Sequence, residues 1–142
     1  MRTSLFRVIA GTVLLAATAA PLMAHHSFAA EFDVNKPVTI KGSVVKMDWI
    51  NPHSWIHIDV KGPDGKMEQW AVEGGAPNAL LRRGWNKNSL PPGIEITVEG
   101  FQAKDGSKRA NGRDITFPDG TRLFVGSTGT GAPDEKEKKE RR

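Results

Sequence analysis

The sequence predicts a mainly β domain that lies between an apolar N-terminal segment and a charged C-terminal tail. Two observations support this prediction. Apolar and polar residues alternate along several short runs that are rich in Val, Ile and Thr, as expected for half-buried strands. Turn signals made of Gly, Pro, Asn and Asp separate these runs.

The predicted elements follow a distinctive order. The predicted strands are, in chain order, residues 38–47, 55–60, 67–73 and 94–101, then a fifth element at 114–117 and a short last strand at 122–125. One helix lies between the third and fourth strands. Pro77 suits its first position, Leu80, Leu81 and Trp85 follow at helical spacing, and Gly84 suits its end.

Three strands, a helix and then two or more strands is the order of an OB fold, a small Greek-key barrel. We therefore predict an OB-like barrel of five or six strands over residues 25–126, with one short helix between strands 3 and 4. A plain β-sandwich is the alternative, but a sandwich does not predict a single helix at that point.

The N-terminus has the three parts of a secretory signal. Arg2 and Arg7 give it a positive start, an apolar run follows over residues 8–20, and Ala24 is a small residue suited to cleavage. The apolar run is shorter than the roughly 20 residues that a transmembrane helix needs, and it ends at Pro21. We predict a signal peptide at residues 1–24, a periplasmic location, and no membrane span after its removal.

The mature chain is small and nearly neutral. Removing 24 of the 142 residues leaves 118, enough for one domain. Loss of Arg2 and Arg7 lowers the 20 basic residues to 18 against 16 acidic ones, a net charge near +2. The absence of cysteine excludes disulfides, thiolate metal sites and lipid attachment at a cleavage-site cysteine.

The last part of the chain has no apolar periodicity. Residues 127–142 begin with Gly, Ser and Thr and end in alternating acidic and basic residues. This composition is typical of a disordered, solvated tail. We predict such a tail at residues 127–142.

A row of polar and aromatic side chains marks the second predicted strand. Alternation there directs Ile56 and Ile58 to the core and a different set of residues to the opposite face. We predict a ligand-binding surface made of that set together with the preceding tryptophan: Trp49, His53, Trp55, His57 and Asp59. The structural alternative is a tryptophan that covers one end of the barrel, with His53 bonded to a turn.

The histidines also suggest a metal site. Cleavage after Ala24 would give His25 a free α-amine beside its imidazole, and these two nitrogens can chelate one ion. Nitrogen ligands suit Cu(II), to which His26, His53 or His57 would add a further nitrogen. The alternative is a weak, accidental His-His pair on a flexible end. Copper is the one cofactor that the sequence suggests.

Catalysis and nucleic-acid binding find less support. Ser54 follows His53 directly, but neighbours on a strand point to opposite faces and do not form a nucleophile–base pair. We predict no catalytic residue, and a copper oxidase or a hydrolase is a third hypothesis. Arg82 and Arg83 beside Trp85 resemble a nucleic-acid patch. Export and the near-neutral charge argue against it, and we expect these arginines on the solvated face of the helix.

Several runs resemble a known family of small exported bacterial proteins, domain-of-unknown-function family 6152. The matching runs are residues 25–33 (HHSFAAEFD), 39–42 (TIKG), 49–53 (WINPH), 70–73 (WAVE), 78–85 (NALLRRGW) and 98–101 (VEGF). The resemblance extends over residues 25–126. It implies a periplasmic location and a compact β-barrel, and it implies no activity, ligand or catalytic residue.

We therefore expect a non-enzymatic periplasmic binding or accessory module. Its partner would be a small molecule, a peptide or a periplasmic protein, and not nucleic acid. A copper-binding protein that uses His25 with further histidines is the alternative.

Overall fold

The computed structural model describes residues 27–127 and 132–133. These residues form the following elements, in chain order: α2 (Phe28–Glu31), β1 (Phe32–Asp48), β2 (Trp55–Lys61), β3 (Met67–Glu73), α3 (Pro77–Leu81), β4 (Glu95–Ala103), β5 (Arg109–Thr116) and β6 (Arg122–Phe124). The predicted signal peptide, His25, His26 and most of the predicted tail lie outside the described residues. Neither described helix is long and apolar enough to cross a membrane.

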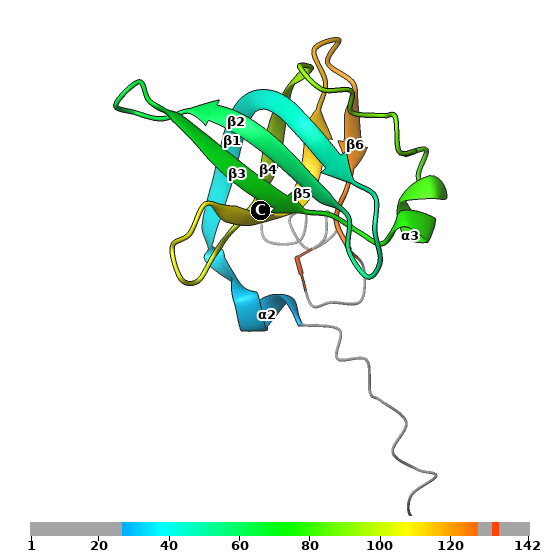
Figure 1. Cartoon of the computed structure of the whole chain (residues 1–142). Coiled ribbons are helices and arrows are strands. Elements are labelled where there is room, and N and C mark those ends of the chain that lie inside the picture. The colour runs from blue at the N-terminus through cyan, green and yellow to red at the C-terminus, as the bar shows by residue number, and fades with distance from the viewer. Residues whose placement is uncertain (1–26, 128–131, 134–142) are drawn as a thin grey trace, which may run out of the picture.

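The strands close into a barrel, as the sequence predicted (Figure 1). Strand β1 pairs antiparallel with β2 and β4, β2 pairs with β3, and β4 pairs with β5. A parallel pairing of β3 with β5 completes the ring, and β6 adds to the outer edge of β5. The mainly β, OB-like barrel with a short helix between strands 3 and 4 is therefore confirmed.

Two strands begin earlier than predicted, and one helix is additional. Strand β1 begins at Phe32 rather than at residue 38, with a register shift before Pro37 that accommodates a residue without an N–H. Strand β5 begins at Arg109 rather than at residue 114. Its first residues are small and buried and do not alternate between apolar and polar, so the sequence pattern did not indicate a strand there. Helix α2 was not predicted. It is a single turn, anchored by the buried ring of Phe28.

Two glycines allow neighbouring strands to approach closely. A Cβ atom on Gly42 would lie 2.3 Å from the backbone oxygen of Asp59, and one on Gly100 would lie 2.1 Å from that of Asn111. Both distances are far shorter than van der Waals contact, and both obstacles are backbone atoms. Gly42 and Gly100 are therefore required where β1 meets β2 and where β4 meets β5.

The barrel interior contains the main hydrophobic core, and a smaller cluster closes one end. Residues of the main core include Ile56, Ile58, Val72, Leu80 and Trp85. The smaller cluster joins α2 to β1 and β4, with Ala132 of the C-terminal segment packed against it: Phe28, Phe32, Phe101 and Ala103. The Phe28 ring meets the Phe101 ring edge-on at 5.5 Å between centroids.

The segment after α3 holds the last strand in place. The helix ends at Leu81, so Trp85 lies beyond it, buried in the core, and its Nε1–H donates to the Phe124 carbonyl at 2.9 Å. Arg83 donates from Nη1 to the Gly126 carbonyl at 2.7 Å and stacks over the Phe124 ring. Arg82 is exposed as expected, but the prediction that Arg83 is solvated was wrong, because it binds the chain after β6.

Candidate functional site

The outer face of β2 carries the predicted row of side chains. Ile56 and Ile58 are fully buried at 0% exposure, which confirms the prediction that their side chains face the core. Trp55, His57 and Asp59 alternate with them and are half-buried. The twist and pairing of the barrel therefore hold an indole, an imidazole and a carboxylate in line on its outside.

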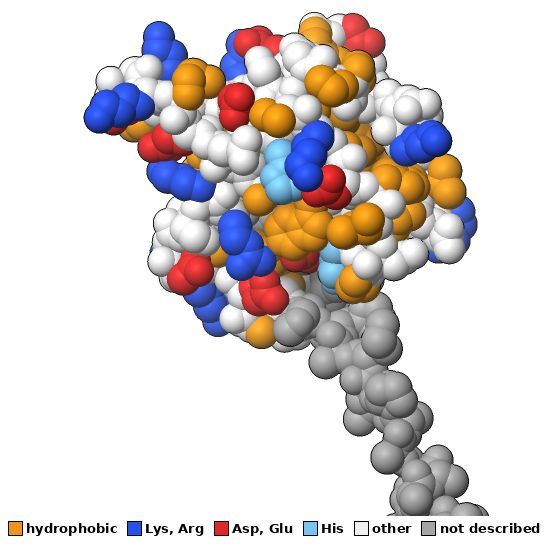
Figure 2. All heavy atoms as spheres, in the orientation of Figure 1, with side chains coloured by type: hydrophobic (Ala, Val, Ile, Leu, Met, Phe, Trp, Pro, Cys, Tyr) orange, Lys and Arg blue, Asp and Glu red, His pale blue; other side chains and the backbone are white. Residues whose placement is uncertain are grey.

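Neighbouring strands extend this row into a surface that we call the β2–β3 face: Asp48, Trp55, His57, Asp59, Gln69, Ala71, Glu73 and Arg109. Trp55 lies between Asp48 of β1 and Glu73 of β3 in the pairing register. His57 pairs with Ala71, which pairs in turn with Arg109 of β5. Figure 2 shows the two described histidines on one side of the molecule with hydrophobic surface between them.

One edge of this face is an ion-paired group around Asp48. Lys46 donates from Nζ to both carboxylate oxygens at 3.0 Å, and His57 Nε2 lies 3.0 Å from Oδ2. The hydrogen bond from Lys46, and to a lesser extent that from His57, lowers the pKa of Asp48 below its usual value. The imidazole of His57 is therefore held in a fixed orientation by its carboxylate partner.

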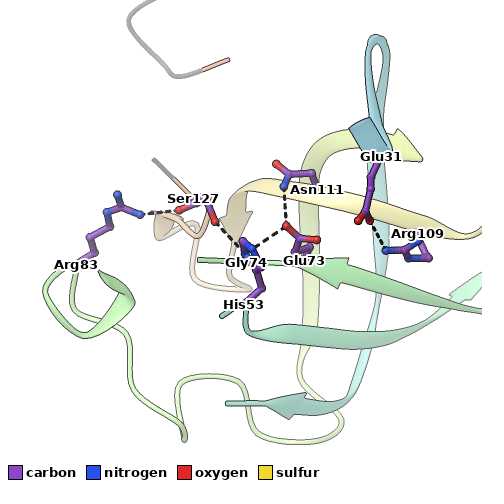
Figure 3. Close-up of polar contacts among 9 residues, drawn as sticks. Glu31, His53, Glu73, Gly74, Arg83, Arg109, Asn111 and Ser127 are labelled. Carbon is purple, nitrogen blue, oxygen red and sulfur yellow. Dashed lines mark hydrogen bonds and ion pairs between the residues drawn. The ribbon is translucent and has the colours of Figure 1, made fainter. Parts of the chain in front are cut away.

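His53 does not join the row of Trp55 and His57 but points to the loop after β3 (Figure 3). Its Nδ1 lies 3.4 Å from the Gly74 carbonyl oxygen, from Glu73 Oε1 and from Ser127 Oγ. Its side chain is 12% exposed, as is that of Glu73. His53 thus connects the β1–β2 loop, β3 and the segment after β6, in agreement with the structural alternative of a histidine bonded to a turn.

Of the two carboxylates that contact histidines, Glu73 is more deeply buried than Asp48. Burial raises the pKa of its carboxyl group above the usual value, while the nearby charges of His53 and Arg109 oppose that rise. Asn111 donates from Nδ2 to Oε1 at 3.5 Å. The charged form of Glu73 is therefore less stable here than in water.

This environment makes a prediction about pH. The unfolded chain releases the Glu73 proton at a lower pH than the folded protein does, so stability falls as pH rises from the unfolded pKa through the folded pKa. Glu73→Gln keeps an oxygen that can accept from Asn111 and carries no charge. We expect the variant to unfold at a higher urea concentration than the wild type at pH 7, and the difference to vanish below about pH 4, where unfolded glutamate is protonated.

The exposed Glu95→Gln variant is the control for this measurement, with a change within about 0.5 kcal/mol at pH 7. Lower stability of Glu73→Gln than of the wild type at pH 7, with no difference below about pH 4, would show that the ionised Glu73 carboxylate is stabilising and would contradict the prediction.

Arg109 was not among the predicted site residues, and its contacts form the other edge of the β2–β3 face. Its guanidinium lies 5.4 Å from the centroid of the Trp55 ring and 5.9 Å from that of Phe32. Its Nη2 donates to Glu31 Oε2 of α2 at 2.9 Å. Arg109 therefore links helix α2 to Trp55 through an ion pair and a cation–π contact. The parallel pairing of β3 with β5 creates this contact, and no local sequence signal reports it.

The remaining predicted residues have different positions. Trp49 is half-buried and packs against the main core at the end of the barrel. His25 and His26 lie outside the described residues. Within the described part of the chain, no three His, Asp or Glu side chains are grouped so that they could hold a metal ion. His53 and His57 instead contact two different carboxylates, Glu73 and Asp48.

No curated protein and no solved structure matches this chain. A family model described as a family of unknown function, DUF6152, matches residues 12–112, which is more than half of the chain. The chain therefore belongs to the DUF6152 family.

Proposed function

We propose that this protein is a non-enzymatic binding or accessory module that is exported to the periplasm, and that it recognises its ligand on the β2–β3 face. The N-terminal pattern of positive charge, apolar run and small cleavage residue supports export. The near-neutral charge of the mature chain favours a small molecule, a peptide or a periplasmic protein over nucleic acid as the partner.

The observation that carries this proposal is the position of Trp55. A large aromatic side chain is half-buried on the outside of a strand whose opposite side buries Ile56 and Ile58 fully. Arg109 stacks on its ring, and polar groups of β1, β2 and β3 surround it. In OB-like barrels, the face formed by the second and third strands is the usual ligand-binding surface.

The placement of the reactive side chains favours binding over catalysis. The hydroxyl of Ser54 is buried at 0% exposure, and its position gives a substrate no access. His53 and Glu73 are largely covered, with side chains that are each 12% exposed. A general base needs a free nitrogen or oxygen within hydrogen-bond reach of its substrate.

Covalent footprinting of the folded protein tests the proposal. Periplasmic extract, separated by molecular size, is added before labelling, and the labelled peptides are quantified by mass spectrometry. We expect protection of residues 55–61 and 67–73, and loss of that protection in Trp55→Ala. Trp49→Phe is the matched control and should retain it. Protection confined to β6 and α3, or unchanged in Trp55→Ala, would overturn the proposed surface.

Copper binding is the second candidate, favoured by the position of the first described residues. Ser27 precedes α2, which Phe28 fixes to the barrel end. His25 is two residues before Ser27, a reach of about 7 Å. If the mature chain starts at His25, its amine and imidazole supply two nitrogens for one ion.

The copper hypothesis predicts a strict dependence on processing. N-terminal sequencing of the exported protein should give a first residue of His25. One extra residue before His25 turns its amine into a non-basic amide, so Cu(II) affinity measured by calorimetry should fall steeply. Acid should also release the ion, because protons compete with it for imidazole nitrogens, whose reference pKa is about 6.5. Affinity that survives both the extension and a double His53/His57→Ala change would indicate adventitious chelation.

A further inference from the structure

A ligand of the β2–β3 face would contact its side chains, because the backbone there is already hydrogen-bonded to neighbouring strands. Strand β2 is paired on one side with β1 and on the other with β3. Strand β3 is paired on its other side with β5 over residues 71–73. A peptide that binds by adding a strand needs a free edge, and the part of this face around Trp55 has none.

Trp55 provides a flat apolar surface whose orientation is fixed. The Arg109 guanidinium contacts its ring, and Glu31 fixes Arg109 in turn. Ala71, next to Trp55 on the face, is too small to cover the indole. The face of an aromatic ring is electron-rich, so it attracts the slightly positive C–H groups of a sugar ring that lies flat against it.

Polar groups follow Trp55 at the spacing of the strands. His57 and Asp59 lie on the same strand, and Gln69 is opposite Asp59 on β3. Together they present an imidazole, a carboxylate and an amide, which include both donors and acceptors. Hydroxyl groups require such a mixture, because each hydroxyl donates one hydrogen bond and accepts others.

The basic side chains around Trp55 each have a carboxylate partner within the protein. Lys46 is paired with Asp48, Arg109 with Glu31, and Lys108 with Glu68 at 3.0 Å. Phosphate groups bind mainly to lysine and arginine, and here they would have to displace these carboxylates. Lys61 is exposed, but it lies at the hairpin end of β2, three register positions beyond Trp55 on this face. The arrangement therefore suits an uncharged ligand.

We propose that the β2–β3 face binds a neutral oligosaccharide of hexose or N-acetylhexosamine units. One sugar ring stacks on Trp55, and the hydroxyls of the next ring bond to His57, Asp59 and Gln69. This inference rests on the proposed function, because it names the class of ligand for the same surface.

Isothermal titration of the mature protein with maltohexaose, cellohexaose and N-acetylchitohexaose tests the inference. At least one of these probes should bind. Trp55→Ala should weaken that binding about tenfold or more, while Trp55→Phe, which keeps an aromatic face, should retain most of it. Leu81→Ala is the control. Leu81 is 51% exposed at the end of α3, outside the β2–β3 face, so affinity should be unchanged.

Three results would overturn the inference, and they bear differently on the proposed function. If folded wild-type protein binds none of the three sugars, the ligand class is wrong. Protection of the same face by periplasmic extract would then leave the proposed function standing. If a ten-nucleotide oligothymidine binds with the Trp55 dependence and the sugars do not, the face recognises an anionic strand. If sugar binding occurs but is equal in Trp55→Ala, it takes place elsewhere on the protein.

Discussion

Replacing Trp85 with alanine is expected to lower the free energy of unfolding by about 3–5 kcal/mol. Trp85 is 1% exposed and belongs to the main core, so its removal leaves a cavity. It also takes away the donor for the Phe124 carbonyl, which is part of β6. Equilibrium denaturation in urea measures the loss.

Leu81→Ala is the control for this change, because Leu81 is nearby at the end of α3 and 51% exposed. Its effect should stay within about 0.5 kcal/mol. Should Trp85→Ala prove as mild as Leu81→Ala, the segment after α3 would not be packed into the core, and β6 would need a different support.

Replacing Ile58 with alanine is expected to cost about 2–5 kcal/mol, the range for truncation of a buried isoleucine. Ile58 has 0% exposure and pairs in register with Trp70 of β3 and Val44 of β1, which are both buried. Met67→Ala on the adjacent strand removes a similar volume at 64% exposure and should cost less than about 0.5 kcal/mol.

This second change tests the site as well as the core. A shift of one residue moves every side chain of a strand to the other face. A cost near zero for Ile58→Ala would place Trp55 and His57 in the interior, and the β2–β3 face would not exist as a binding surface.

Much of the fold could be predicted from local patterns. The alternation around Ile56 and Ile58 shows which side chains of β2 face the core, and Pro77 marks the start of α3. The early part of β5 could not be predicted, because Ala110, Asn111 and Gly112 are buried without apolar alternation. They are held by pairing to both β3 and β4, which is information that no single segment carries.

The candidate site could be predicted only in part for the same reason. The outward direction of Trp55, His57 and Asp59 follows from the period of one strand. The contact of Arg109 with Trp55 depends on the parallel closure of the barrel. The contact of His53 with Glu73 depends on where the β1–β2 loop turns, and a proline in that loop interrupts the alternation.

The four tryptophans allow one direct measurement of the central claim, that the ligand binds over Trp55. All four lie in the described part of the chain, and each gives an indole N–H signal in a ¹⁵N-labelled sample. Trp85 and Trp70 are buried in the core, and Trp49 packs against it. On addition of the periplasmic fraction that protects the β2–β3 face, the Trp55 signal should shift most and the Trp85 signal should stay in place. A shift of Trp85 or Trp49 with no change at Trp55 would contradict the account.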